Sequence, residues 1–443
     1  MREIIQRQLP LLPALPAHAH LQELEVMSKM LDANPDIARL VHADLVRGIS
    51  AKNGSEGLRG DQVLRAAILY HSNGWSFEKL AFELRYHAAY RWFCLLDHDQ
   101  FPSKSSLHRD IQRIEPATWE AIHRIIVGHA QKLGIEDGKK VRTDCTVVET
   151  NIHEPSDSSL LWDCVRELTR QLKNASKLVS VEYSDHCKRA KRKAWAIRNA
   201  KKQKQRVPMY RELVKVTKKT IGYARRSLQA LRCRKHPMAA GCADAMQDMI
   251  ELALQVVEQT ERRVFAGESV PASEKVVSIF EPHTDVIRKG GRETYYGHKI
   301  CLSAGPSNLI TDCVILDGNP RDSSLAVDMM TRHKELYGQP AEQAAFDGGF
   351  ATQENLSALK AMHIQDVMFS KRVGLAISDM VSDSWIYKRL RDFRAGIEGI
   401  ISFLKRGFGL GRCRFRGLRS FKSYVFGSVV SANLLVLARH QLA

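Results

Sequence analysis

The period of the apolar residues changes three times within the first 280 positions of this 443-residue chain, and these changes limit the folds that it can adopt. Residues 20–135 carry apolar side chains at helical spacing in several short segments. Residues 140–150 (KVRTDCTVVET) are rich in Val and Thr and predict a strand. Residues 156–265 return to a helical pattern, and strand character resumes at residue 276. The pattern predicts an α/β core that a large helical insertion interrupts, with a helical region in front.

The part of the chain after the insertion is expected to alternate between strands and helices. Residues 305–308 (GPSN) are a turn signal between two β-rich runs and predict a hairpin. The expected strands are 276–280 (VVSIF), 295–304, 309–316, 343–346 (QAAF) and 364–369. The expected helices are 323–337, 352–362 and 384–405.

Turn and capping signals divide the helical segments. Residues 71–74 (HSNG) predict a turn, and Ser76 is a suitable N-cap for the helix that follows. Ser105 or Ser106 is expected to cap a further helix, and Pro208 is expected to break the helices of the insertion. Short helices joined by a Gly-containing turn are typical of helix-turn-helix DNA readers. An ordinary helical bundle gives the same pattern, so both interpretations stay open.

The net charge of +18 lies in one stretch of the chain. Residues 188–235 hold 19 Lys and Arg against one acid, Glu212, so the rest of the chain is formally neutral. Such a block favours a polyanion as partner, and nucleic acid is the obvious one because its binding releases counterions. The alternative is a solvated helical surface.

Hydropathy, the first residues and the cysteines give an expectation about the compartment. The longest apolar candidate for a membrane span, residues 424–438, is interrupted by Gly, Ser and Asn. The start, MREIIQRQLPLL, does not resemble a signal peptide. Nine cysteines without a C-x-x-C pair fit reduced thiols. We therefore expect a soluble, cytoplasmic protein with no membrane partner.

Three carboxylates are candidates for chemistry. Asp144 lies within the first expected strand, and Asp347 follows the strand at 343–346, directly before two glycines. Open α/β sheets commonly place active sites at the carboxyl ends of their strands. Glu398 lies on the long helix, where Arg391, Arg394 and Lys405 share its face within about 60°.

Three acids from separate elements suit a hard cation such as Mg²⁺, while the bases beside Glu398 suit DNA phosphates. Two such ions can promote phosphoryl transfer without a nucleophilic Ser or Cys. Other interpretations stay open. Asp144 can be a core aspartate, Asp347 a turn former, and Arg394 with Glu398 an i,i+4 ion pair.

Together these motifs resemble the DDE-type transposases of bacterial insertion sequences, which have a ribonuclease H-like catalytic core. The resemblance rests on Asp144 in a strand, on residues 347–350 (DGGF) and on the spacing Arg394-x3-Glu398-x6-Lys405. Residues 147–162 look like the stretch after the first acid in one group of these enzymes, and residues 60–114 are similar to their helical N-terminal domain. One departure is Arg391, where the related signature has Tyr.

The resemblance implies an activity and a set of site residues. Asp144, Asp347 and Glu398 would be catalytic and would bind Mg²⁺ or Mn²⁺, two ions per active site. The enzyme would bind transposon ends, hydrolyse the phosphodiester and use the freed 3′-OH to attack target DNA. Two alternatives are a transposase-derived DNA-binding protein without activity and a related nuclease that cuts without joining.

The resemblance and the charge pattern also divide the chain into four parts. We expect a helical N-terminal DNA-binding domain at 1–135, a ribonuclease H-like core at 136–155 and 270–410, a basic helical insertion at 156–269, and a C-terminal basic segment and helix at 411–443.

Double-stranded DNA is the expected partner, and a homodimer or larger assembly on DNA is expected because two ends must be cut and joined. The chain would act in the bacterial cytoplasm, with the nucleoid. The expected DNA-binding residues are Arg109 in the N-terminal domain, Lys191, Arg192, Lys193, Lys201 and Lys202 in the insertion, and Arg391, Arg394, Lys405, Arg406, Arg412, Arg414 and Arg416 near the C-terminus.

Overall fold

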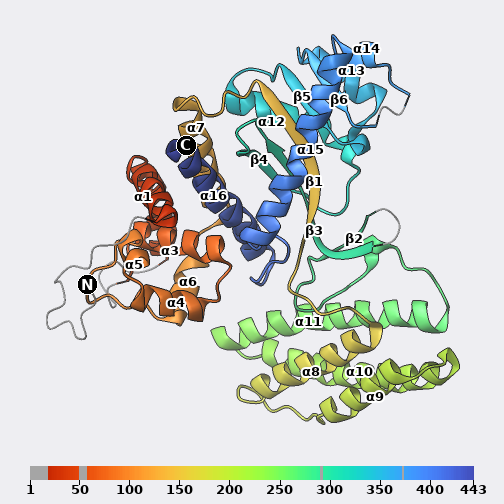
Figure 1. Cartoon of the computed structure of the whole chain (residues 1–443). Helices are drawn as coiled ribbons and strands as arrows, with labels where there is room; N and C mark the ends of the chain where they lie inside the picture. Colours follow the sequence, from red (N-terminus) through yellow and green to blue (C-terminus); the bar gives the residue numbers. More distant parts are fainter. Residues whose placement is uncertain (1–17, 49–56, 290–292, 372–373) are drawn as a thin grey trace, which may run out of the picture.

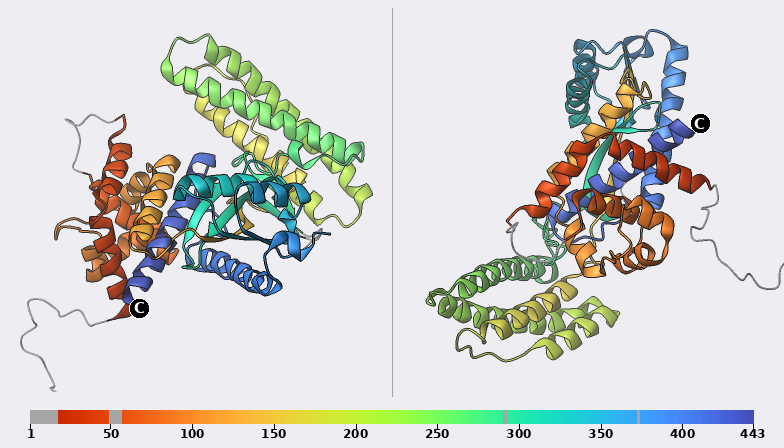
Figure 2. Two further views of the ribbon diagram at one scale, coloured as in Figure 1. Left: turned by 90° about the horizontal axis from the view of Figure 1, so that it is seen from above. Right: turned by 90° about the vertical axis from the view of Figure 1, so that its left-hand side faces the viewer.

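The computed structural model describes residues 18–48, 57–289, 293–371 and 374–443. It is a mixed α/β fold in which one sheet lies between two groups of helices (Figure 1). The N-terminal helices lie on one side of the sheet, and the helices of the insertion form a separate layer beyond its end (Figures 1 and 2).

The sheet has six strands in the order β2-β3-β1-β5-β6, and β4 also pairs with β3. The central strand β1 is antiparallel to β3 and parallel to β5, and β5 is parallel to β6. The strands are β1 (Lys140–Glu149), β2 (Asp285–Lys289), β3 (Glu293–Ala304), β4 (Ile310–Ile315), β5 (Gln343–Phe346) and β6 (Asp366–Phe369). The expected α/β class is confirmed.

The expected hairpin joins β3 to β4. The turn at residues 305–308 is closed by backbone hydrogen bonds from Gly305 N to Leu309 O and from Asn308 N to Gly305 O, each 3.2 Å long. Asn308 has a φ of +67°, a left-handed conformation that Asn tolerates better than most residues. The turn chemistry therefore sets the register of this antiparallel pair.

Helices cover both faces of the sheet. α12 lies on one face and α15 on the other, as the view from above shows (Figure 2). The helix expected at 384–405 forms α15, and it packs on the sheet with an apolar stripe that is buried at Leu390, Ile397, Ile400 and Leu404. The elements in this part are η3 (Asp322–Ser324), α12 (Ala326–Tyr337), η4 (Gly348–Phe350), α13 (Gln353–Ala361), α14 (Ile377–Met380) and α15 (Ser384–Gly407).

The N-terminal helices and the last helix, α16 (Leu418–Leu442), share one hydrophobic core with β3 and β4. α16 packs against α1, α3 and α7 and against β4. The N-terminal helices are α1 (Ala19–Asp32), α2 (Pro35–Val46), α3 (Gly60–Asn73), α4 (Phe77–Tyr86), α5 (Ala88–Phe93), α6 (Lys104–Ile111) and α7 (Pro116–Lys132).

α16 is, among the described residues, the one helix long and apolar enough to cross a membrane by length and composition. Its best 18-residue window has a mean hydropathy of 1.4, and 83% of that window is buried inside the chain. Its apolar side chains are therefore already used in the shared core.

The insertion has a hydrophobic core of its own, to which the strands of the sheet contribute no residue. It consists of α8 (Asp157–Ala175), α9 (Cys187–Asn199), α10 (Gln203–Arg232), α11 (Pro237–Thr260) and a π-helical turn, η1 (Glu261–Phe265), followed by the short η2 (Ala272–Glu274). α8 and α10 each contact all the other long helices of this layer.

The prediction of a strand at 276–280 is wrong, because these residues form no strand. Val276 and Ile279 pack into the core of the insertion instead. The side chain of Gln259 on α11 serves both backbone groups of Val276: Oε1 accepts from its N–H (2.9 Å) and Nε2 donates to its carbonyl (3.4 Å). The amide of Gln259 thus satisfies the backbone groups that a neighbouring strand would otherwise pair. The next strand of the sheet, β2, begins nine residues after Val276.

Two local expectations are also wrong, whereas the cap at Ser76 is confirmed by its hydrogen bond from Lys79 N. The cap of α6 is Ser103, whose hydroxyl accepts from Ser106 N at 3.1 Å, so Ser106 lies inside the helix. Pro208 lies inside α10, which continues through it. Tertiary packing of α10 against α8 and α11 outweighs the one backbone hydrogen bond that proline removes.

Candidate active site

The register of two parallel strands places Asp144 beside Asp347. Thr143 on β1 is paired with Phe346, the last residue of β5, so the two aspartates are the next positions along neighbouring strands. Asp347 directly follows β5 and is the N-cap of the 3₁₀ helix η4, which begins at Gly348. The central strand and its parallel neighbour thus bring two carboxylates together at the carboxyl end of β5.

The long helix α15 brings the third acid and an arginine to the same place. The guanidinium of Arg394 contacts all three acids. Its Nη2 lies 3.1 Å from Asp144 Oδ2 and 3.1 Å from Asp347 Oδ1, while its Nη1 lies 3.0 Å from Glu398 Oε1. Side chains about two hundred positions apart in the sequence therefore meet around one positive charge.

The cluster is open to solvent on one side. The side chains of Arg394 and Asp144 are 13% and 15% exposed, whereas those of Asp347 and Glu398 are 41% and 67% exposed. Burial raises the pKa of Asp347, but hydrogen bonds from the Ser370 hydroxyl (2.7 Å) and the Gly348 N–H, with the charge of Arg394, outweigh it and leave this pKa below its ordinary value. Asp347 is therefore held as a carboxylate.

The donor set fits a divalent cation in chemistry and charge. Three carboxylates face one guanidinium, which leaves two formal negative charges uncompensated. No three His, Cys, Asp or Glu side chains among the described residues are positioned to hold one metal ion, and the cation that the three acids share here is the guanidinium of Arg394. Asp144 and Asp347 already share one nitrogen as partner, so they are the nearest to a common site.

Arg142 positions the helix that carries Glu398, and the motifs in the sequence did not single it out. It lies on β1, donates to Phe393 O (2.8 Å) and Asn308 Oδ1 (2.5 Å), and is only 4% exposed. A Cβ at Gly396 would collide with its guanidinium, so glycine allows α15 to approach the sheet here. The one available signal was a charged residue in a strand that is otherwise rich in Val and Thr.

The expected DNA-binding bases near the C-terminus differ in their contacts. Arg391 is exposed and lies 3.9 Å from Asp392. Lys405 and Arg406 lie in the last turn of α15. The remaining three follow this helix: Arg412 donates to Ile152 O, Arg414 donates to Gly74 O (2.6 Å), and Arg416 is exposed.

Arg412 and Arg414 thus tie the segment after α15 to other parts of the chain. Arg109 in the N-terminal region lies on α6, where it pairs with Asp110 (3.0 Å).

The bases expected in the insertion lie on and after α9. Lys193 is half-buried and pairs with Glu212 (2.8 Å), and the Lys191 ammonium lies 6.0 Å from the ring centre of Trp162. Arg192 is exposed on α9, and Lys201 and Lys202 are exposed between α9 and α10. This group lies in the layer of the insertion, apart from the sheet that carries the aspartates (Figure 1).

Comparison with known families gives one match. The family described as Transposase domain (DUF772) matches residues 13–113, which include α1 to α6 among the described helices. A search of curated proteins and a search of solved structures each find no match. The match supports a transposase role for this chain, and it ends before the first of the three acids.

Proposed function

We propose that this chain is a DDE-type DNA transposase with a ribonuclease H-like catalytic core. It binds the ends of an insertion sequence, cleaves the phosphodiester bond in a metal-dependent reaction and joins the freed end to target DNA. The observation that carries the proposal is the meeting of Asp144, Asp347 and Glu398 around Arg394. The transposase family match at residues 13–113 supports it independently.

Asp144, Asp347 and Glu398 would hold Mg²⁺ or Mn²⁺, and when bound such ions supply an activated water and positive charge for the leaving oxygen. The chain itself orients the acids. Ser370 and the Gly348 N–H fix Asp347, and the Cys145 N–H donates to Asp144 Oδ1 (2.7 Å).

Arg394 has a second role in this proposal. It neutralises the acids while no DNA is bound, and it pairs with a DNA phosphate when the acids take a metal cation in its place. The planar guanidinium suits both partners, since it donates to carboxylate and phosphate oxygens in the same geometry. Arg391, Lys405 and Arg406 on the same helix extend the positive charge along the DNA.

Cleavage of a labelled DNA end tests the proposal. Asp144→Asn is expected to reduce metal-dependent cleavage by more than about a hundredfold, the range seen when even a supporting partner of a metal ligand is lost. End binding should stay close to that of the wild-type chain, because the acid does not contact phosphate. Asp392→Asn is the matched control, since this exposed acid on α15 lies outside the cluster.

Equal cleavage by Asp144→Asn and the wild-type chain would contradict the proposal. Cleavage without joined product would favour a nuclease, and binding without cleavage by the wild-type chain would favour a DNA-binding protein derived from a transposase. Action in the bacterial cytoplasm and assembly as a dimer or larger complex on double-stranded DNA are part of the same proposal.

A further inference from the structure

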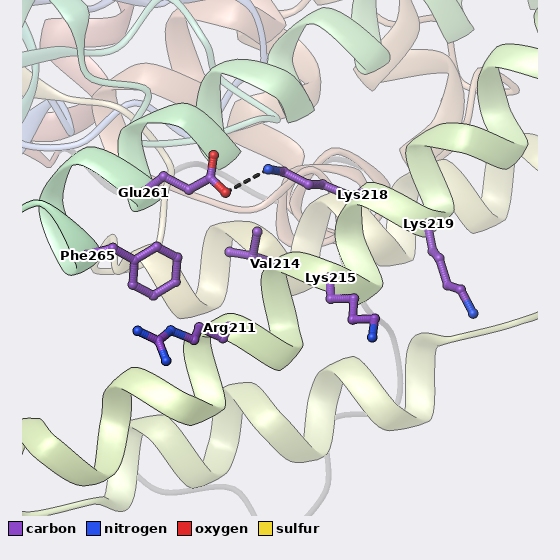
Figure 3. Close-up of a pocket in the computed structure, with 7 residues that line it drawn as sticks. All are labelled: Arg211, Val214, Lys215, Lys218, Lys219, Glu261 and Phe265. Atoms are coloured by element: carbon purple, nitrogen blue, oxygen red, sulfur yellow. Dashed lines mark hydrogen bonds and ion pairs between the residues drawn. The ribbon is translucent and has the colours of Figure 1, made fainter.

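A hollow in the insertion gathers positive charge outside the acid cluster. It has a volume of about 510 Å³ and lies between α10 and η1 (Figure 3). Its charged and aromatic lining comes from Arg211, Lys215, Lys218 and Lys219 on α10 and from Glu261 and Phe265 on η1. These bases lie within the basic block 188–235, but none of them is among the individual DNA-binding residues expected from the sequence.

Most of the positive charge in this hollow is not neutralised within the protein. Lys218 pairs with Glu261 at 2.7 Å. No carboxylate of the described residues lies within 4 Å of the charged nitrogens of Arg211, Lys215 or Lys219, and all three are exposed. The hollow therefore presents three exposed cations to an external anion.

The spacing of Arg211, Lys215 and Lys219 fits a chain of regularly spaced anionic groups better than a single small anion. They occur every fourth residue, which on an α-helix gives a row with a rise of about 6 Å per step. Successive phosphates along one nucleic acid strand present charge at a comparable repeat. A small anion would occupy one step of the row and leave the others unpaired.

An exposed ring borders the row. Phe265 is 37% exposed, and the guanidinium carbon of Arg211 lies 5.9 Å from its ring centre. The π-helical turn η1 places Phe265 and Glu261 on the side of the hollow that faces α10 (Figure 3). A ring beside a row of cations is the arrangement on which single-stranded nucleic acids stack a base while their phosphates follow the charge.

We propose that Arg211, Lys215 and Lys219 bind consecutive phosphates of one DNA strand, with Phe265 stacking against an unpaired base. This inference rests on the proposed function, because it takes DNA as the partner. It assigns a second DNA contact to the chain, in a layer separate from the acids.

The salt dependence of DNA binding tests this site in the full chain. The logarithm of the binding constant falls linearly with the logarithm of the salt concentration. Each lost phosphate contact makes this negative slope shallower, by about 0.9 for duplex DNA and by about 0.7 for single strands. The triple variant R211Q/K215Q/K219Q is therefore expected to reduce the magnitude of the slope by about 3 on duplex DNA and by about 2 on single-stranded DNA. The control K139Q/K177Q/K334Q removes the same net charge from exposed positions outside the N-terminal region and outside residues 188–235, and it should change the slope by less than the value of one phosphate contact.

Replacement of the ring separates the two kinds of strand. F265A is expected to weaken binding of a single-stranded oligonucleotide about fivefold or more, with a smaller effect on duplex. Unchanged single-strand binding by F265A would overturn the role of the ring. Circular dichroism should show unchanged helix content for all variants, because every substituted side chain is at least partly exposed.

The outcomes distinguish this inference from the proposed function. An unchanged slope in the triple variant, with wild-type DNA binding and cleavage intact, would overturn the phosphate row and leave the transposase proposal standing. Absence of DNA binding by the wild-type chain would instead overturn both.

Discussion

The two helical regions of this chain relate to the sheet in opposite ways. The N-terminal helices and α16 form one continuous core with β3 and β4, whereas the insertion packs around a core of its own. The first region is also tied to the sheet by buried polar groups. Asn433 on α16 accepts from Ile310 N (3.0 Å) and donates to Ile310 O (2.8 Å), and His123 on α7 reaches the same carbonyl.

This difference shows how one chain combines a rigid part with a separable one. Separating the N-terminal region from the sheet would expose apolar surface and leave backbone groups of the sheet unpaired. We therefore expect the N-terminal region and the sheet to unfold together, as one cooperative unit. The insertion has no such shared core, and it carries the excess positive charge of the chain. The region that matches the transposase domain thus shares a core with the sheet that carries Asp144, and the basic layer has a core of its own.

The largest expected effect comes from a matched pair of amide substitutions. Asn433→Ala should cost about 2 to 4 kcal/mol of the free energy of unfolding, because it removes two buried hydrogen bonds, leaves the Ile310 N–H without its side-chain acceptor and leaves the Ile310 carbonyl with His123 as its side-chain partner. Gln259→Ala removes the two bonds to Val276 and should act mainly inside the insertion. Hydrogen exchange should therefore become faster across β3, β4 and α16 in the first variant and in α11 in the second. The same exchange pattern in both variants would contradict the comparison.

The pH dependence of stability should come from the shared core. Complete burial lowers the pKa of His71 to about 3, compared with about 6.5 in the unfolded chain. Between these values the unfolded chain binds a proton that the folded chain does not, so stability is full above pH 6.5 and falls as the pH decreases. At about 1.4 kcal/mol per pH unit, the loss by pH 4.5 is about 3 kcal/mol.

Urea unfolding at pH 7.5 and pH 4.5 measures this loss, and His71→Gln should reduce it. Burial also lowers the pKa of His123 and His333, so part of the loss should persist in the variant. An identical loss in His71→Gln would show that this histidine does not control acid sensitivity.

The smallest effects are expected at two helical glycines. A Cβ at Gly427 on α16 would lie 2.5 Å from His71 Nε2, so Gly427→Ala should destabilise the chain by about 1 to 3 kcal/mol. At Gly222 on α10 a Cβ would meet nothing within 4 Å, so Gly222→Ala should stabilise the insertion by up to about 1 kcal/mol. Thermal unfolding should show a lower melting temperature for Gly427→Ala and a higher one for Gly222→Ala. Shifts of both melting temperatures in the same direction would contradict the difference in packing at these two glycines.

Local chemistry made much of the sheet predictable. The hairpin, the strand Gln343–Phe346 and the long helix follow from turn residues, β-rich runs and an apolar stripe. The strand expected at 276–280 does not form. Its first residue, Val276, makes its backbone hydrogen bonds to the side chain of Gln259 on α11, a partner that no local pattern in the sequence reveals.

The candidate site was predictable in its members but not in its arrangement. Asp144, Asp347 and Glu398 could be chosen from their positions in expected elements. The role of Arg394 as their common partner could not be derived, because it depends on how α15 crosses two strands. The sequence also could not show which bases of residues 188–235 pair with Glu212. This stretch has one acid for 19 bases, and only the fold shows that Lys193 lies beside it.

Calorimetric titration with Mn²⁺ tests the central claim most directly, because it measures whether three distant acids form one cation site. The account predicts that Asp144→Asn and Glu398→Gln each weaken Mn²⁺ binding, and that Arg394→Gln strengthens it by removing the competing positive charge. Arg391→Gln, on the same helix but outside the cluster, should bind as the wild-type chain does. Mn²⁺ binding that is the same in all five proteins would contradict the account.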